Sequence, residues 1–434
     1  MIYFFKLMHY RPPILFYPIL FMACMVALVS CKAPSSNKVK LATISEHQSA
    51  PIQSEHIIIG HLGPQHLANL VFRNSKDGPK LVGWGRMPMT EWPVGSASEK
   101  QVVQQNPDHR YSNGGCAIDL DNDGEDEIVV ARGAMSNLNH ASLLWFDPVD
   151  DQAYWEEHTI ASLWDRGYTA PHDIKPYIFE NEEGNMVKTV LANKSRRELY
   201  MFVVPDDPRQ EWDSRLIGEF PIADQSGLEI IDINQDGRED IVSGIYWLEA
   251  PADPFEGDWK FHQYGTWDEE GRRWGGMNQH GIADFDGDGA LEIIVSEAEI
   301  PDARLSLFDA DLPQLEQMWQ EVPLDSGLDA PHSILVLDLN DDQQPDLLVG
   351  EMTAGGWDFP MNPNPKIYAY INQGEHRFEK QVFSEGWGVH EMKIAPVKIE
   401  GKTMIYAADE IQPQKFKAMN THVSYWLLDT SGSQ

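Results

Sequence analysis

Polar side chains recur at one repeat position of this 434-residue chain, and several of them are histidines. Each stands six residues before an acidic loop or before a degenerate copy of one. The imidazole of histidine titrates near neutral pH and can take up or release a proton. If the repeats bring these side chains together, the sequence predicts acid/base chemistry at a shared site. The seven positions are His66, Asn113, His172, Ser226, Asn278, His332 and His390, and His280 follows Asn278 by two residues.

Four nine-residue acidic loops begin at positions 119, 232, 284 and 338. Oxygen-bearing side chains stand at loop positions 1, 3, 5 and 9, and glycine stands at position 6 in the first three loops. This donor pattern suits a hard cation of calcium size, with a backbone carbonyl as a further ligand. The predicted ligands are Asp119, Asp121, Asp123 and Glu127; Asp232, Asn234, Asp236 and Asp240; Asp284, Asp286, Asp288 and Glu292; and Asp338, Asn340, Asp342 and Asp346.

Two other interpretations of the loops fit less well. An EF-hand needs a glutamate at position 12 and flanking helices, whereas apolar β residues follow position 9 here. An acidic turn without metal would crowd several carboxylates with no counter-charge. Gln343 replaces the glycine in the last loop, which predicts a weaker site.

The loops connect strands, because apolar runs such as Ile128-Val129-Val130 follow them directly. The first gap between loop starts is twice the others, which predicts a unit that has lost its loop near Ile178. Further copies at His66–Phe72 and His390–Pro396 complete seven units. Seven such units indicate an all-β fold, a seven-bladed β-propeller. We expect Val423–Leu428 to pair with an N-terminal strand around residues 57–59 and close the ring.

At these loops the sequence resembles the FG-GAP or VCBS repeat proteins, and the resemblance covers nearly all of residues 56–430. It implies a propeller with FG-GAP-type calcium loops, in which up to four Ca²⁺ ions are structural. With histidine before the loop, the sequence is also similar to aldos-2-ulose (anhydrofructose) dehydratase and to propeller-fold polysaccharide lyases. That similarity implies a carbohydrate-active enzyme, whereas other propellers with such loops only bind partners.

The second strand of each unit is expected to return to the same end of the channel. It ends at a charged residue or a tyrosine, namely Arg86, Arg132, Arg196 or Arg197, Tyr246, Glu297, Glu351 and Glu410. We expect Arg86, Glu297 and Glu351 to bind substrate together with Asn113 and Asn278.

Histidine, arginine and tyrosine together suit β-elimination on a uronic-acid-containing oligosaccharide such as one from ulvan. Arg132 would hold the carboxylate, and His172 or His332 would remove the neighbouring proton. Tyr246 or His390 would protonate the departing oxygen, while His280 and His66 complete the candidate catalytic set. Dehydration and chain-cleaving lysis differ only in the group that leaves.

Three alternatives stay open at this point. The propeller could be a noncatalytic glycan- or protein-binding module, or a histidine-dependent glycosidase. The histidine cluster could also hold an additional divalent metal, because imidazole is a common ligand of transition ions.

The N-terminus predicts export. Lys6 and Arg11 precede an apolar run from Ile14 to Val29, and Ser30-Cys31 completes a lipobox. We expect residues 1–30 to be a signal peptide, Cys31 to be lipidated, and residues 31–55 to be a flexible tether before the 56–430 propeller. The membrane would be contacted through this lipid alone, in the cell envelope and at the outer membrane.

Net charge and cysteine content limit which partners and which covalent cross-links are expected. Without residues 1–30 the chain keeps 31 of its 33 basic residues and all 68 acidic ones, a formal charge of −37. Nucleic acid is a poor partner for such a surface. The expected partner is an acidic oligosaccharide substrate, which follows from the elimination chemistry and not from the charge. Cys116 is the one cysteine beyond Cys31, so no disulfide framework is expected.

Overall fold

The computed structural model describes residues 43–46, 51–60, 69–85, 88–97, 100–104, 111–134, 137–149, 152–162, 171–194, 197–221, 226–266, 278–353, 362–409 and 422–428. All of these belong to the compact unit Leu41–Gln434, which is separate from Met1–Lys40. Within these ranges no helix has the length and apolar character needed to cross a membrane. The predicted signal peptide and the predicted lipidation site, Cys31, lie outside the described residues.

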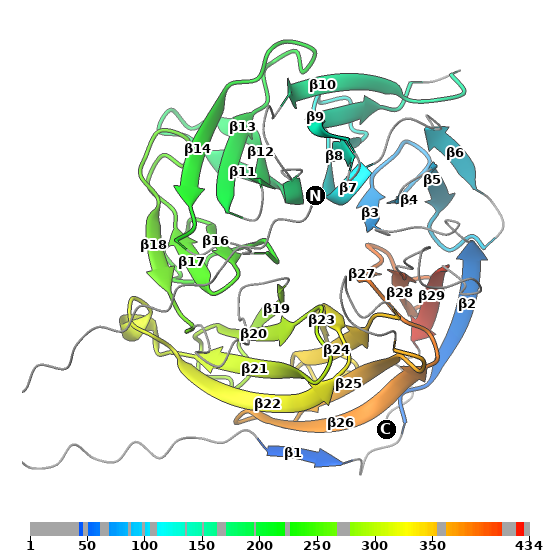
Figure 1. The fold of residues 1–434 in the computed structure, drawn as a ribbon, viewed down its shortest axis with the longest axis vertical. Coiled ribbons are helices and arrows are strands. Elements are labelled where there is room, and N and C mark those ends of the chain that lie inside the picture. The colour runs from blue at the N-terminus through cyan, green and yellow to red at the C-terminus, as the bar shows by residue number, and fades with distance from the viewer. Residues whose placement is uncertain are drawn as a thin grey trace, which may run out of the picture. The chain divides into compact units, whose positions relative to one another are not determined.

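Seven antiparallel sheets surround a common centre, which confirms the all-β seven-bladed propeller (Figure 1). Blade 1 contains β3 (Asn69–Arg73), β4 (Lys80–Trp84), β5 (Met89–Pro93) and β6 (Gln101–Gln104). Blade 2 contains β7 (Tyr111–Ile118), β8 (Glu127–Ala134), β9 (Asn137–Asp147) and β10 (Glu156–Ser162). Blade 3 contains β11 (Pro171–Glu180), β12 (Met186–Lys194), β13 (Glu198–Val203) and β14 (Ser214–Glu219). Blade 4 contains β15 (Glu229–Ile231), β16 (Asp240–Ser243), β17 (Tyr246–Glu249) and β18 (Lys260–Gln263).

The remaining three blades follow the same order from the centre outward. Blade 5 contains β19 (Asn278–Ala283), β20 (Glu292–Glu297), β21 (Ala303–Asp309) and β22 (Gln320–Leu328), with the short 3₁₀ helix η1 (Leu312–Gln314) between the last two. Blade 6 contains β23 (Pro331–Leu337), β24 (Asp346–Glu351), β25 (Lys366–Asn372) and β26 (Arg377–Glu385). Blade 7 contains β27 (Glu391–Ile394), β28 (Thr403–Ala408), β29 (Val423–Leu428) and β2 (Ser54–Gly60).

The N-terminal strand β2 closes the ring, as the sequence predicts. It pairs antiparallel with β29, and Ile57 lies opposite Tyr425. The structure differs from the expected tether in one segment, because β1 (Thr43–Glu46) pairs parallel with β26 and adds a fifth strand to blade 6. Ile44 packs against the apolar cluster between blades 5 and 6, and this burial favours an ordered strand there.

The hydrophobic core lies between neighbouring blades. One cluster joins Leu191 of blade 3, Trp247 of blade 4 and Ile293 of blade 5, all of them buried. Apolar side chains alternate along the strands and pack face to face across the blade interfaces. The propeller is therefore held by its interfaces, and the innermost strands are free to present polar residues to the central channel.

The four acidic loops have one backbone conformation and connect the first two strands of blades 2, 4, 5 and 6. In each, the amide at position 6 donates to the carboxylate at position 1, over 2.8 to 3.2 Å. In each, the amide at position 2 donates to the carboxylate at position 9, over 2.5 to 3.1 Å. Blade 3 has a simple turn after Glu180 instead, so the loop predicted to be lost near Ile178 is indeed missing there.

Candidate functional site

His172 and His332 begin the innermost strands of blades 3 and 6, and each follows a proline. The strand register skips both residues: Pro171 pairs with Lys194 and Asp173 with Asn193, while Pro331 pairs with Glu351 and Ser333 with Gly350. Each histidine is thus the extra residue of a β-bulge. A bulge re-aims a side chain relative to the regular alternation of the strand.

The central channel contains a cavity of about 380 Å³. Its lining includes His172, His280, His332 and His390, which come from blades 3, 5, 6 and 7. We call these four the channel histidines. These histidines converge on one cavity, as predicted from the repeat, but Ser226 and Asn278 of the same repeat position are not in its lining, and His66 lies outside the described residues.

The imidazoles of His332 and His390 stack, with ring centroids 4.2 Å apart and ring planes inclined by 21°. Nδ1 of His332 donates a hydrogen bond to the backbone carbonyl of His390, over 2.9 Å. Nε2 of His332 lies 3.6 Å from Oε1 of Glu299. A proton on Nε2 would therefore lie between the imidazole and that carboxylate.

His172 and His280 have different environments. Nδ1 of His172 lies 3.3 Å from Oδ2 of Asp173, so a carboxylate orients this imidazole. Nε2 of His280 donates to the carbonyl of Gly244, over 2.8 Å. Burial lowers the pKa of His280, although the Gly244 carbonyl opposes the shift. His280 is therefore neutral near pH 7 and joins blades 4 and 5.

Two ammonium groups and three carboxylates also line the channel. Nζ of Lys175 lies 3.2 Å from Glu229, and Nζ of Lys393 lies 2.8 Å from Glu391. Burial opposes the charge on Lys393, but Glu391, Glu229 and Asp173 outweigh it and raise the pKa of this lysine. Asp173 of blade 3 and Lys393 of blade 7 line the same cavity.

The sequence-based predictions did not include these charged residues, although the sequence contains a pattern that marks them. His172-Asp173-Ile174-Lys175 and His390-Glu391-Met392-Lys393 are two copies of a His-acid-x-Lys motif at one blade position. Residues two apart on a strand share a face. The acid and the lysine of each copy therefore enter the channel together.

Arg132 and Tyr246 are not among the residues that line the cavity. Nη1 of Arg132 pairs with Oε1 of Glu157, 2.6 Å away. Tyr246 is buried beside Phe220 and Phe261, with ring centroids 6.0 and 6.4 Å from its own. Burial also raises the pKa of Tyr246. Neither side chain lines the cavity. Carboxylate binding, expected of Arg132, and protonation of the departing oxygen, expected of Tyr246, would therefore have to come from other residues if the cavity binds the substrate.

Three expected substrate-binding residues are also buried away from the cavity lining. The backbone amide of Asn278 donates to Oγ of Ser226, over 2.9 Å, which links blades 4 and 5. The carboxylate of Glu297 accepts a hydrogen bond from the guanidinium of Arg304, over 2.9 Å. The carboxylate of Glu351 accepts one from the side-chain amide of Asn362, over 3.0 Å. The first contact joins two blades at their innermost strands, and the other two lie within blades 5 and 6. Arg86 and the side chain of Asn113 lie outside the described residues.

Comparison with known proteins leaves the activity open. No described protein family and no curated protein matches the sequence. Among solved structures, an oxidoreductase (glucose dehydrogenase) from Thermus thermophilus aligns with 87% of this chain and 100% of its own, at 12% identity and a TM-score of 0.43. The intramolecular trans-sialidase from Ruminococcus gnavus, in complex with oseltamivir carboxylate, aligns with 87% of this chain and 98% of its own, at 12% identity and a TM-score of 0.39. Likeness at this level says nothing about the reaction.

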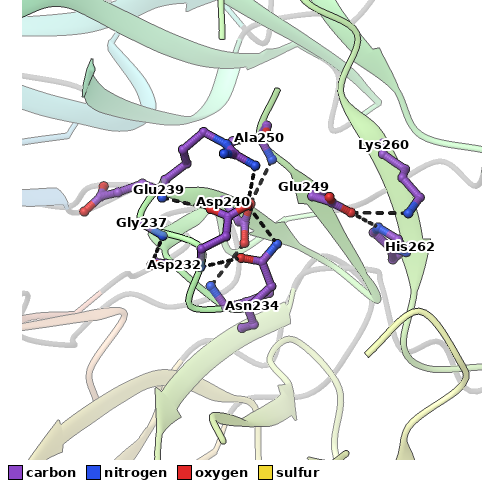
Figure 2. Close-up of polar contacts among 12 residues, drawn as sticks. Asp232, Asn234, Gly237, Glu239, Asp240, Glu249, Ala250, Lys260 and His262 are labelled. Carbon is purple, nitrogen blue, oxygen red and sulfur yellow. Dashed lines mark hydrogen bonds and ion pairs between the residues drawn. The ribbon is translucent and has the colours of Figure 1, made fainter. Parts of the chain in front are cut away.

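The acidic loops lie at the other end of the innermost strands. Figure 2 shows the second loop, in which Asp232, Asn234 and Asp240 bring their side-chain oxygens together. Oδ1 of Asp240 accepts the amide of Ala250 at 2.8 Å, and burial raises the pKa of Asp240 to about 6. The donor set of oxygens around a buried carboxylate fits a hard cation such as Ca²⁺.

Proposed function

We propose that the channel is the active site of a carbohydrate-active carbon–oxygen lyase that performs β-elimination on an acidic sugar. The observation that carries this proposal is the convergence of the four channel histidines on one cavity of about 380 Å³. In a seven-membered ring, blade 3 lies opposite blades 6 and 7. His172 therefore faces the stacked pair His332 and His390 across the cavity, which supplies a proton acceptor and a proton donor on two sides of a bound ring.

His172, oriented by Asp173, would remove the proton from the carbon beside the sugar carboxylate. The electron pair of the broken C–H bond forms the new C=C bond, and the neighbouring C–O bond breaks. His332 would give its proton to the departing oxygen. Loss of a hydroxyl as water is dehydration, and loss of a sugar alcohol is chain cleavage. A positioned acid or base of this kind contributes about 10² to 10⁴ in rate.

Lys175 and Lys393 would take the carboxylate-binding role expected of Arg132. They are the ammonium groups in the described part of the lining. Each already has a carboxylate partner, Glu229 or Glu391, so a substrate carboxylate would share the ammonium with it. Three channel carboxylates against two lysines disfavour a highly charged ligand, which favours a short oligosaccharide with one uronate at the site.

A noncatalytic glycan-binding channel is the second candidate. It is supported by the pairing of both lysines and by the hydrogen bond of His280 to a backbone carbonyl, contacts that also occur in a rigid binding site. A metal-dependent channel has less support. In the described residues, the channel histidines are not part of any group of three potential ligands with atoms within 4.8 Å of one another.

The deciding experiment incubates the purified propeller with uronate oligosaccharides and follows the ultraviolet absorbance of the conjugated C=C–carboxylate product. Absorbance that rises with the wild type and falls at least a hundredfold in rate with His172→Asn supports the lyase, since a general base contributes about that much. Binding without product supports the binding module. New reducing ends without absorbance would instead identify a glycosidase.

We also propose that the four acidic loops bind structural Ca²⁺ through the ligands named from the sequence. Support comes from their shared conformation and from Glu292, whose buried Oε1 has no hydrogen-bond partner in the described structure. Ca²⁺ bound only by the folded state would stabilise it by mass action. Chelation should lower the melting temperature, and Ca²⁺ but not Na⁺ should restore it; an unchanged melting temperature would refute calcium binding.

For its place in the cell, we propose a lipid anchor at Cys31 that holds the propeller at the outer membrane. Support comes from the lipobox and the charged, apolar N-terminus. Cys31→Ala should move the protein from the membrane fraction to the soluble periplasmic or secreted fraction. Retention of the variant in the membrane fraction would contradict the anchor.

A further inference from the structure

The third acidic loop differs from the others because a histidine from the next blade reaches it. His376 lies in the turn between β25 and β26 of blade 6, and its side chain is 1% exposed. Its Nε2 lies 3.4 Å from Oδ2 of Asp286 in blade 5. Ligand atoms of His376, Asp286 and Glu292 all lie within 4.8 Å of one another.

Buried polar atoms at this place lack partners in the described structure. Neither Nδ1 nor Nε2 of His376 has a hydrogen-bond partner, and Oε1 of Glu292 has none. Leaving a buried polar group unsatisfied costs about 1 to 3 kcal/mol. A cation bound between the imidazole and the carboxylates would satisfy these atoms together.

The turn that carries His376 is strained and is anchored to the loop. Glu375 and His376 have φ angles of 54° and 57°, in the left-handed region that non-glycine residues rarely adopt. Nδ2 of Asn372 donates to the carbonyl of Phe285 in the third loop, over 2.9 Å. Backbone strain from such φ angles persists where the surrounding structure holds the residues in place, and it is common at ligand-binding sites.

The first loop shows the contrast. There the next blade supplies Lys188, whose Nζ bonds to Asn122 at 2.8 Å and lies 3.8 Å from Asp119. An ammonium is already charged and cannot coordinate a metal ion, whereas a neutral imidazole can. The third loop thus has a potential nitrogen ligand at the blade interface where the first loop has an ammonium group.

We propose that His376 completes a blade-bridging metal site with Asp284, Asp286, Asp288 and Glu292, and that this site binds a divalent first-row transition ion more tightly than the Ca²⁺ that occupies it when no such ion is present. The four carboxylates have ligand atoms within 4.8 Å of one another. Carboxylates alone suit Ca²⁺ or Mg²⁺, and adding imidazole shifts a site toward Mn²⁺, Co²⁺ or Zn²⁺. The ion would join blade 5 to blade 6 and is independent of the channel chemistry.

The test titrates Co²⁺ into the full-length protein in a buffer that contains excess Ca²⁺, so that folding does not depend on the added ion. Calorimetry gives the stoichiometry, and the visible spectrum of Co²⁺ reports a nitrogen ligand. We expect one Co²⁺ per chain in the wild type. His376→Asn keeps an oxygen ligand, and it should weaken Co²⁺ binding at least about tenfold, a loss typical of disturbing even an outer-sphere partner. Ca²⁺ binding should be retained.

His262→Gln is the matched control, because His262 is also a buried histidine beside a carboxylate, 2.9 Å from Glu249, but outside the acidic loops. It should bind Co²⁺ like the wild type. Absence of Co²⁺ binding in the wild type, or unchanged Co²⁺ binding in a folded His376→Asn variant, would overturn the proposal. Circular dichroism establishes that both variants are folded.

Discussion

His332 donates its Nδ1 proton to the backbone carbonyl of His390 and stacks on that residue's ring, with centroids 4.2 Å apart. This relationship fixes the tautomer of neutral His332 and leaves Nε2 as the nitrogen that can exchange a proton. It also ties blade 6 to blade 7 at the end of the channel where the other histidines lie.

The base role of His172 predicts a selective loss of rate. His172→Asn removes the proton acceptor but keeps a polar side chain, so kcat should fall by about 10² to 10⁴ while KM changes little. Initial rates on a uronate oligosaccharide provide the measurement. His262→Gln, on the outer strand β18, is the control and should keep the wild-type rate. Equal losses in both variants would indicate a general effect on folding instead.

The channel lysines predict a dependence on the substrate's charge. Lys393→Met should raise KM roughly tenfold to a hundredfold for the acidic substrate, because a hydrogen bond to a charged group contributes about 1.5 to 3 kcal/mol. Binding of an analogue whose carboxylate is reduced to an alcohol should hardly change. Lys260→Met at the periphery is the control. A variant that binds both compounds equally poorly would argue that Lys393 only supports the fold.

Gln343 should destabilise the fourth loop. Its φ angle is 67°, and the glycines at the same position of the other loops have φ angles of 89° or more, as Gly237 at 89° and Gly289 at 94° show. Gln343→Gly should raise the free energy of unfolding by about 1 kcal/mol, since a left-handed non-glycine residue costs at least that. Denaturant titration in excess Ca²⁺ measures this. Gly289→Gln should have the opposite effect, and a Gln343→Gly variant that is less stable would contradict the strain.

His56 on the closing strand predicts a loss of stability in acid. Its ring stacks on Trp426, with centroids 4.3 Å apart, and burial lowers its pKa to about 4. The unfolded chain therefore takes up this proton more readily, and stability present above about pH 6.5 falls as the pH drops toward 4. Melting temperatures from pH 7 to pH 4.5 test this. His56→Phe keeps an aromatic ring on Trp426 and should reduce the fall of the melting temperature with decreasing pH. If the melting temperatures of the variant and the wild type fall equally, other groups cause the loss of stability.

The fold could be predicted from the sequence to a large extent, because the acidic loops mark four of the seven blades and their spacing reveals blade 3, which lies between two of them and lacks a loop. His172, His332 and His390 could be placed because each stands six residues before an acidic loop or a degenerate copy of one, and His280 follows that position of blade 5 by two residues. Arg132 and Tyr246 could not be placed, since alternation along a second strand does not tell whether a side chain meets a partner such as Glu157 or a neighbouring blade. The contact of His376 with Asp286 could not be predicted from the sequence either, because it depends on how blades 5 and 6 pack.

The most direct test of the central claim is a crystal structure of the His172→Asn variant soaked with a uronate oligosaccharide. We expect the sugar to lie in the channel, with the carbon beside its carboxylate next to residue 172 and the scissile oxygen next to His332. A sugar bound on the outside of the blades, or an empty channel at saturating ligand, would contradict the assignment of the channel as the functional site.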